Sequence, residues 1–432
     1  MQIAIGDNAD PRAGILVGAL SGALERYNPE NAVRASFHEF LPLANESGKI
    51  HVIGFGKAGL GMYRGLVSAL PGPPESASII VPHNAMVENV PEGLTLLRGS
   101  HPYPDRSSQE SSERLLGSIE GLTEDDLVFV LVSGGSSSLF EVPVEGLSIE
   151  RVSAVTKCLM EAGSDIFMLN AARRIMSRVK GGKLLSYIYP ARAVSLIISD
   201  VPGDEPAYVG SGPTVEWTAP GHYADSDVLG AIAGCDPAAP EAISSRGMIT
   251  GKAAQCTNRI VLRNSDVVKD LGLRLSREGY NVIIPGYFVS GSVEELSQRI
   301  LSMVREEFSR SGEPFWFVMG GESTSVVRGT GTGGRNQELV VRLALRLEQG
   351  EDCVFMSAGS DGIDGNSKAM GAVYYPGMFD GIPHEAIMDS LARSDAFPLL
   401  NSLGAALISG PTGNNVSDII AGFYGGKGKV NE

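Results

Sequence analysis

Glycine-rich polar segments recur along this sequence, and each follows a short apolar run of the kind that forms a β-strand. Backbone N–H groups of such loops can converge on one point, and they bind anions best where a helix begins just after the loop. Glycine accounts for 54 of the 432 residues, above the usual share of roughly 7%. The pattern predicts an enzyme that handles phosphate.

The first of these segments, Gly54 to Gly59, has the spacing GxGxxG between an apolar run and an apolar helix. A dinucleotide site would also need an acidic residue after the next strand, where the sequence has Pro82 to Asn84. Lys57 stands at the start of the helix, where a cation opposes the helix dipole unless an anion binds. We expect Gly56 and Lys57 to contact an anion; the alternative is a tight turn with a solvated lysine.

A serine- and glycine-rich loop follows the apolar run at residues 127–132. It lacks the Gly-Lys-Ser/Thr of a Walker A loop and the GxSxG of a hydrolase nucleophile elbow. Its backbone and hydroxyl donors predict a site for a phosphate or carboxylate, with an ordinary connection as the alternative. The candidate binding residues are Ser133, Gly134, Gly135, Ser136 and Ser137.

Residues 169–180 have helical periodicity, with Asn170, Arg173, Ser177 and Lys180 on one face. A cationic stripe in an acidic protein suggests an anionic ligand. Alternatively, the lysines complement the carboxyl end of a helix, which explains Lys180 better than Arg173.

Two pairs of aspartates lie in glycine loops directly after strand-like runs: Asp200 with Asp204, and Asp361 with Asp364. One or two carboxylates together with substrate phosphates are the usual ligands of Mg²⁺, although Asx turns explain each aspartate equally well. We expect Asp200 and Asp361 to act in catalysis and Asp204 and Asp364 to bind the metal.

A last polar segment carries Glu322 at a strand end and then Arg335 and Asn336 at the start of an apolar helix. Arg335 has the same unfavourable placement near a helix start as Lys57, and again an anion would explain it. All three are candidate site residues.

The net charge of −15 makes nucleic acid and anionic membranes improbable partners, and no apolar run has the length of about 18 residues expected of a membrane helix. The cysteines are far apart and predict neither a disulfide framework nor a zinc site, which fits a cytoplasmic protein. Their positions are Cys158, Cys235, Cys256 and Cys353. The sequence is compatible with a homo-oligomer.

Strand-like runs alternate with helical segments, which predicts parallel α/β architecture in two domains. The stretch from Ser211 to Ala254 is rich in Pro, Gly and Ala and is the expected connection. We place the domains at residues 1–240 and 241–432, with the last stretch packing back on the first domain. The expected strands are Ile50 to Ile53, Ser78 to Val81, Leu127 to Val132, Ala193 to Ile198, Asn281 to Ile284, Phe315 to Met319 and Cys353 to Ser357.

Six motifs in this order resemble the class II glycerate 2-kinases of the MOFRL family, and the resemblance spans nearly the whole chain. They are GFGKAG, VSGGSSSL, LNAARRIMSRVKGGKL, ISDVPGDEP with SGPT, MGGESTSVVRGTGTGGRNQEL and SAGSDGIDG. The resemblance implies a larger N-terminal Rossmann-like domain with a parallel sheet, a smaller C-terminal α/β domain, and an active site in the cleft between them. It also implies that Lys57 and Arg335 are active-site residues.

The implied reaction is phosphorylation of D-glycerate at its 2-hydroxyl by ATP with Mg²⁺ or another divalent cation, giving 2-phospho-D-glycerate and ADP. Such a transfer needs cations, a metal ion and backbone donors, which these loops contain. Two alternatives are an NAD(P)-dependent hydroxypyruvate or 2-hydroxy-acid reductase and a non-catalytic module that binds small anions or nucleotides.

Overall fold

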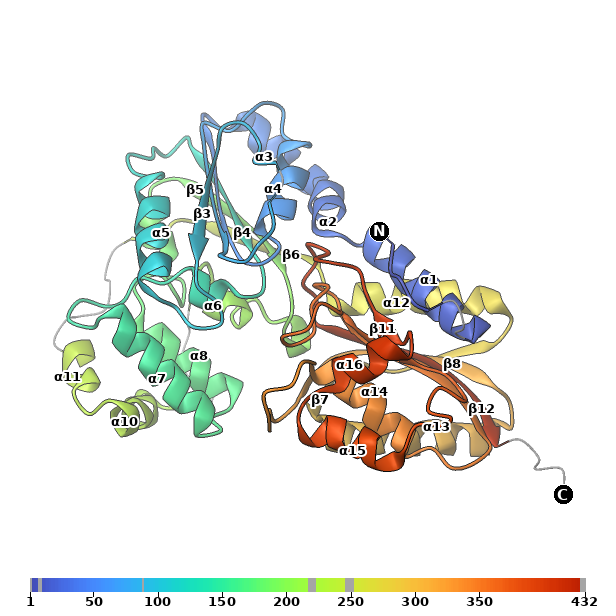
Figure 1. Ribbon diagram of the computed structural model, residues 1–432. Coiled ribbons are helices and arrows are strands. Elements are labelled where there is room, and N and C mark those ends of the chain that lie inside the picture. The colour runs from blue at the N-terminus through green and yellow to red at the C-terminus, as the bar shows by residue number, and fades with distance from the viewer. Residues whose placement is uncertain (1, 7–9, 88, 217–222, 245–251, 428–432) are drawn as a thin grey trace, which may run out of the picture. The chain divides into compact units, whose positions relative to one another are not determined.

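The computed structural model describes residues 2–6, 10–87, 89–216, 223–244 and 252–427 (Figure 1). The chain divides into two compact units. Pro29–Leu262 form one, which we call the parallel-sheet unit, and Met1–Asn28 with Arg263–Glu432 form the other, the mixed-sheet unit.

Six parallel strands form the first sheet, in the order β3-β2-β1-β4-β5-β6. The strands are β1 (Ile50–Phe55), β2 (Ser76–Pro82), β3 (Leu94–Gly99), β4 (Leu127–Val132), β5 (Arg192–Ile198) and β6 (Cys256–Leu262). The strand order reverses between β1 and β4, because the chain runs outward from β1 to β3 and then returns to the other side of β1. The expected Rossmann-like parallel sheet is therefore confirmed.

The strands expected from sequence are those in the middle of this sheet. All six residues of β4 are buried, as expected of a continuous apolar run covered on both faces. The edge strands β3 and β6 are absent from the expected set. Their residues are only partly buried, and β6 (CTNRIVL) contains polar side chains that an edge strand can expose.

Helices cover this sheet, and a further helical group, made of α7, α8, α10 and α11, has its own core (Figure 1). The helices of the unit are α2 (Pro29–Ser36), α3 (Leu41–Glu46), α4 (Gly59–Val67), α5 (Arg106–Gly117), α6 (Ser136–Leu139), α7 (Ile149–Glu161), α8 (Ile166–Met176), α9 (Leu184–Ile188), α10 (Asp225–Cys235) and α11 (Ala239–Ser244). Short 3-10 helices are η1 (Phe37–Glu39), η2 (Pro202–Asp204) and η3 (Val209–Ser211).

A disulfide joins Cys158 of α7 to Cys235 of α10. The sequence-based expectation of no disulfide is therefore wrong. The two cysteines are 77 residues apart, but the packing of α7 against α10 brings their Cα atoms within 5.9 Å. Linear spacing could not reveal this contact.

The second sheet is mixed, in the order β11-β10-β9-β12-β8-β7. Only β7 and β8 pair in parallel, whereas β12 runs antiparallel between β8 and β9, and β10 runs antiparallel to β9 and β11. The strands are β7 (Asn281–Ser292), β8 (Phe315–Thr324), β9 (Glu351–Gly359), β10 (Gly371–Tyr374), β11 (Ala406–Leu407) and β12 (Asp418–Lys427).

Helices pack on both faces of the mixed sheet (Figure 1). One face is covered by α1 and α12, and the other by α13 and α14 with α15 and α16 beside them. The helices are α1 (Pro11–Arg26), α12 (Asn264–Leu275), α13 (Val293–Ser311), α14 (Arg335–Leu345), α15 (His384–Ala392) and α16 (Ala396–Ser402), with the 3-10 helix η4 (Ser276–Glu278).

The division into units differs from the boundary placed at residues 240/241. Strand β6 pairs with β5, so the first sheet continues to Leu262. Helix α1 buries its apolar side against α12 and β9 and so belongs to the mixed-sheet unit. The last strand, β12, lies between β8 and β9 of the same unit rather than on the first domain. The expected connection at residues 211–254 contains α10 and α11, and its residues 217–222 and 245–251 lie outside the described part.

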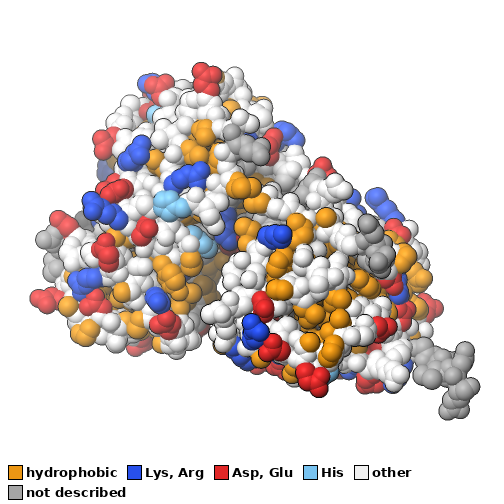
Figure 2. Space-filling view, in the orientation of Figure 1, with side chains coloured by type: hydrophobic (Ala, Val, Ile, Leu, Met, Phe, Trp, Pro, Cys, Tyr) orange, Lys and Arg blue, Asp and Glu red, His pale blue; other side chains and the backbone are white. Residues whose placement is uncertain are grey.

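Within the described ranges, no helix has both the length and the apolar character needed to cross a bilayer. On the face drawn in Figure 2, acidic and basic side chains are interspersed among neutral and apolar ones.

We expect reduction of the disulfide to lower the free energy of unfolding by about 4 kcal/mol, because the bond closes a loop of 77 residues. Urea unfolding with and without a reductant measures the difference. Cys256→Ser, which leaves the bond intact, should keep the reductant effect, whereas Cys158→Ser should abolish it. Titration of four thiols instead of two in the denatured, unreduced protein would contradict the assignment.

Candidate functional site

Two of the predicted loops meet at the carboxyl edge of the parallel sheet, on either side of the point where the strand order reverses. The backbone N–H of Lys57, after β1, donates to the carbonyl oxygen of Gly134 in the serine loop (residues 133–137), after β4, at 2.9 Å. A Cβ atom on Gly135 would lie 3.5 Å from Cγ of Lys57 and 3.0 Å from Cδ2 of His101. Ligands of open α/β sheets bind at this position, so Lys57 and the serine loop form a candidate site.

The serine loop is shaped by its own hydroxyls. Oγ of Ser133 accepts a backbone N–H of the loop after β1 at 3.1 Å, and Oγ of Ser136 donates to the last carbonyl of β1 at 2.9 Å. Gly56 approaches so closely that a Cβ atom there would lie 2.2 Å from Oγ of Ser133. Ser133 and Ser136 are buried, so only Gly135 and Ser137 expose surface to a ligand.

The expected helical face of four polar residues is not formed, because α8 ends before the last two of them. Ser177 is extended, with φ −113° and ψ 146°. Lys180 is fully buried, where its Nζ donates to a backbone carbonyl at 2.9 Å and pairs with Glu141. Asn170 and Arg173 remain on the helix, and Lys180 acts as one half of an internal ion pair.

Arg173 is half-buried, and within the described ranges its guanidinium has no hydrogen-bond or ion-pair partner. Burial lowers the pKa of Arg173, and attraction to Glu141 opposes that change. A cation without a direct partner in a partly dehydrated position gains from a bound anion.

Asp200 and Asp204 follow β5, at the same carboxyl edge of the sheet. Asp200 is half-buried, and Asp204 has a positive φ of 54° at the end of η2. Among the residues that the structure describes, no cluster of three or more His, Cys, Asp or Glu side chains could hold a metal ion. Metal binding by Asp204 stays a prediction.

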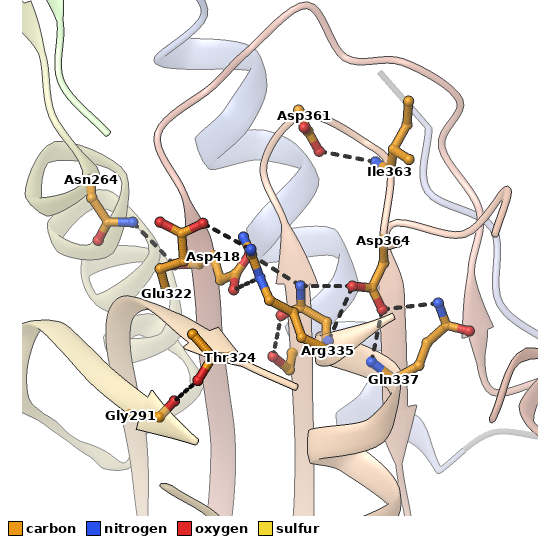
Figure 3. Close-up of polar contacts among 12 residues, drawn as sticks. Asn264, Gly291, Glu322, Thr324, Arg335, Gln337, Asp361, Ile363, Asp364 and Asp418 are labelled. Carbon is orange, nitrogen blue, oxygen red and sulfur yellow. Dashed lines mark hydrogen bonds and ion pairs between the residues drawn. The ribbon is translucent and has the colours of Figure 1, made fainter. Parts of the chain in front are cut away.

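In the mixed-sheet unit, Arg335 is the first residue of α14 and is held by two carboxylates (Figure 3). Its Nε and Nη2 atoms donate to Asp418 at 2.7 and 3.0 Å, and Nη1 lies 2.8 Å from Oε1 of Glu322. Burial lowers the pKa of Arg335, but Asp418 and Glu322 more than offset this, so the pKa lies above its ordinary value. The anion expected at this helix start is thus supplied by the protein itself.

Asp364 caps the start of α14 from a separate loop (Figure 3). Its Oδ1 accepts from the backbone N–H of Asn336 at 3.1 Å, and its Oδ2 accepts from the backbone N–H and side-chain Nε2 of Gln337, both at 2.9 Å. Burial raises the pKa of Asp364 to about 6, although these hydrogen bonds act in the opposite direction. Asp364 therefore fixes the helix that carries Arg335, and both of its oxygens are occupied.

The remaining polar residues lie at the same edge of the mixed sheet. Asn336 donates from Nδ2 to Asp418 at 3.1 Å and accepts from Ser357, so its side chain is part of the buried network. Asp361 is half-buried, and its Oδ1 accepts from a backbone N–H two residues later at 3.1 Å, as in the Asx turn considered above. Glu322 is 46% exposed and can turn toward a ligand.

Two residues of this arrangement were missed in the sequence. Asp418 stands alone before the apolar run of β12, and its only signal is a carboxylate at the start of a buried strand. His101 follows β3, an edge strand that was not expected, and the fold places its ring beside Gly135, which spacing along the chain does not reveal.

Because the pKa of Asp364 lies above its ordinary value of 3.8, the proton binds the folded form more tightly, and stability from this group is lost as pH rises through about 6. Between pH 4 and 7 the wild type should lose roughly 2 kcal/mol of unfolding free energy relative to Asp364→Asn. Urea unfolding at several pH values measures this difference. A difference that does not change with pH, or that changes in the opposite direction, would refute the assignment.

Two family models match the chain. The model described as "Domain of unknown function (DUF4147)" matches residues 15–243, and the model of the MOFRL family matches residues 315–418. Each match contains one of the two sets of loops described above.

Individual relatives cover nearly the whole chain. A glycerate 2-kinase of Picrophilus torridus is 38% identical over 96% of this chain and 97% of its own length. A putative hydroxypyruvate reductase of Agrobacterium vitis is 32% identical over 88% of both chains. The crystal structure of a glycerate kinase of Thermotoga maritima superposes with a TM-score of 0.81 at 28% identity, covering 95% of this chain and 99% of that one.

The two-domain α/β architecture, the two family models and the relatives of matching length agree with the motif resemblance. The chain therefore belongs to the glycerate 2-kinase family, and it contains a DUF4147 region followed by a MOFRL region.

Proposed function

We propose that this enzyme transfers the γ-phosphoryl group of ATP to the 2-hydroxyl of D-glycerate, giving 2-phospho-D-glycerate and ADP. The similarity to a relative named glycerate 2-kinase over 96% of the chain carries the proposal. The 2-position is part of the proposal, since the relative of known structure is named only a glycerate kinase.

Lys57 and Arg335 supply the positive charge that this transfer requires. Phosphoryl transfer depends mainly on positioning and on neutralising charge on the transferring group, and needs no covalent nucleophile. Lys57 lies at the reversal point of the parallel sheet, beside Gly135. Arg335 uses three N–H groups on Asp418 and Glu322, and its remaining donors are available to a phosphate or carboxylate.

The acceptor hydroxyl loses its proton as the new P–O bond forms and the bond to the ADP oxygen breaks. Asp200 and Asp361 are the proposed acceptors of that proton, because each is a half-buried carboxylate at the carboxyl end of a strand. Arg173, which has no partner in the described ranges, and the backbone of Gly135 are proposed to bind anionic groups of the ligands.

The carboxylate oxygens at these strand ends are the donor type that Mg²⁺ prefers, so the residues fit a divalent ion. Asp204 with Asp200, or Asp361, would hold it, and Glu322 is exposed enough to assist. Asp364 does not fit, because four N–H bonds already occupy its two oxygens. When bound, the ion neutralises phosphate charge.

The reductase considered from the sequence is also the function in the name of the Agrobacterium vitis relative, a putative hydroxypyruvate reductase. Against it, β2 ends at Pro82 and is followed by His83, which bonds Ser107, where an NAD site would place a carboxylate on the ribose hydroxyls. A module that only binds anions would not need carboxylates and cations at the same strand ends.

Incubation with D-glycerate, ATP and Mg²⁺, and separately with hydroxypyruvate and NADH, distinguishes these functions. We expect glycerate-dependent ADP formation and no NADH oxidation. Oxidation of NADH without ADP formation would favour the reductase, and binding without either reaction would favour the non-catalytic module.

We expect Lys57→Ala to lower kcat about a hundredfold or more, the cost of removing a group that stabilises transition-state charge. Steady-state kinetics and the melting temperature are measured together, with the exposed Lys157→Ala as the matched control. The proposed role fails if Lys57→Ala turns over at the wild-type rate.

Arg335→Ala should lower kcat by a similar factor, but it also leaves the buried Asp418 unpaired, which costs about 3 kcal/mol or more. The double variant Arg335→Ala/Asp418→Asn removes that charge and should recover stability without recovering turnover. The exposed Arg310→Ala serves as the control. Recovery of turnover together with stability would show that Arg335 is only structural.

A further inference from the structure

Two hydrogen-bonded side chains behind the serine loop, those of Ser211 and Asn170, determine where the hydroxyl of Ser137 points. Oγ of Ser137 lies 3.0 Å from Oγ of Ser211 in η3, and Oγ of Ser211 lies 2.7 Å from Oδ1 of Asn170 in α8. Ser211 and Asn170 are buried, whereas Ser137 is partly exposed. The chain therefore leads from the interior of the unit to the surface of the candidate site.

The direction of this chain is set at Asn170. Its Nδ2 donates to the carbonyl oxygen of Ile166 at 2.9 Å, which fixes the amide with Oδ1 toward Ser211. The reversed amide would place two oxygens against each other. Oδ1 can only accept, so Ser211 donates its single hydroxyl hydrogen to it, and Ser211 can then only accept from Ser137.

Ser211 itself is firmly held. Its carbonyl oxygen accepts from Nε of Arg174 at 3.3 Å and from the backbone N–H of Gly181 at 3.1 Å. The guanidinium of Arg174 also lies over the ring of Tyr208, 5.4 Å from the centroid. Ser211 adopts a positive φ of 63°, which surrounding contacts must maintain in a residue with a side chain. The acceptor for the Ser137 hydrogen is therefore pre-formed.

We propose that Oγ of Ser137 is a hydrogen-bond acceptor that recognises a hydroxyl group of a ligand, with Ser211 and Asn170 as positioning residues. The hydroxyl hydrogen of Ser137 is committed to Ser211, so only lone pairs face the site. Phosphate and carboxylate oxygens have no hydrogen to donate, whereas a hydroxyl does. This replaces the anion-binding role expected of Ser137 from the sequence.

The inference rests on the proposed function, in which hydroxyls are offered by two ligands: D-glycerate and the ribose of ATP. The test uses, for each hydroxyl, one analogue with hydrogen and one with fluorine in its place. Fluorine cannot donate a hydrogen bond. D-lactate and 3-fluoro-D-lactate carry hydrogen and fluorine at the position of the 3-hydroxyl of glycerate. For the 2-hydroxyl, the pair is 3-hydroxypropanoate and its 2-fluoro derivative. For the ribose hydroxyls, the pairs are deoxy and fluoro analogues of ATP.

Titration calorimetry of the wild type and Ser137→Ala measures binding without turnover. We expect Ser137→Ala to weaken one natural ligand by about two- to tenfold, the usual worth of a neutral hydrogen bond, and to leave its deoxy and fluoro analogues unchanged. The pair of analogues whose affinity is unchanged by Ser137→Ala identifies the hydroxyl that Ser137 binds, and therefore the ligand that carries it. The matched control is Ser118→Ala, at a serine after α5 whose hydroxyl donates to the backbone carbonyl of Leu115 at 2.7 Å.

Ser211→Ala tests the direction of the chain, because it frees the hydrogen of Ser137 to donate. In that variant the fluoro analogue should bind better than the deoxy analogue, and in the wild type it should not. The proposal is overturned if Ser137→Ala weakens the fluoro analogue as much as the natural ligand, or weakens no ligand. If the wild type binds neither glycerate nor ATP, the proposed function is overturned as well. If the wild type turns over normally and Ser137→Ala leaves the affinity for every ligand unchanged, only this inference is overturned.

Discussion

Helix α14 begins with a cation, Arg335, and two carboxylates, those of Asp364 and Asp418, stabilise this helix start. Asp364 accepts the first N–H groups of the helix, and Asp418 fixes the guanidinium of Arg335. Asp418 belongs to β12, the strand between β8 and β9, so the position of Arg335 is tied to the middle of the sheet. The dipole at a helix start is unfavourable for an arginine, but the carboxylates offset this and fix the position of the guanidinium. Electrostatic catalysis requires charged groups that are fixed in this way before the reaction.

The parallel-sheet unit reaches a comparable rigidity with neutral groups. The hydroxyls of Ser133 and Ser136 bond the neighbouring backbone, and Gly56 leaves room for that contact. Because these hydroxyls are used internally, the surface offered to a ligand is limited to the backbone of Gly135 and to Ser137. The orientation imposed on Ser137 by Ser211 makes the Ser137 hydroxyl selective for groups that can donate a hydrogen bond, whereas the backbone N–H of Gly135 suits an anion.

Much of this arrangement is predictable from the sequence, because buried parallel strands are continuous apolar runs and glycine loops follow them. The run LVFVLV gives β4 residue for residue, and the order of the motifs indicates the family. Edge strands such as β6 mix polar and apolar residues and escape the pattern. The pairing of Cys158 with Cys235, and of Asp418 with Arg335, depends on packing between distant segments, which spacing along the chain does not encode.

Local electrostatics also explain where the interpretation of single residues failed. Lys180 follows a helical period in the sequence, but α8 ends at Met176 and the lysine turns inward to Glu141. Asp364 has the surroundings of a metal ligand in a glycine loop, yet the N–H groups of α14 occupy its oxygens. In both cases the charged group binds a partner from a distant part of the chain, Glu141 for Lys180 and the start of α14 for Asp364, and is therefore not available to a ligand.

The most direct test of the central claim is identification of the product by phosphorus and proton NMR after incubation with D-glycerate, ATP and Mg²⁺. The account predicts a new phosphomonoester whose phosphorus couples to the single proton on C2, formed in equal amount with ADP. Coupling to the two protons on C3, or ADP formation that does not depend on glycerate, would contradict it.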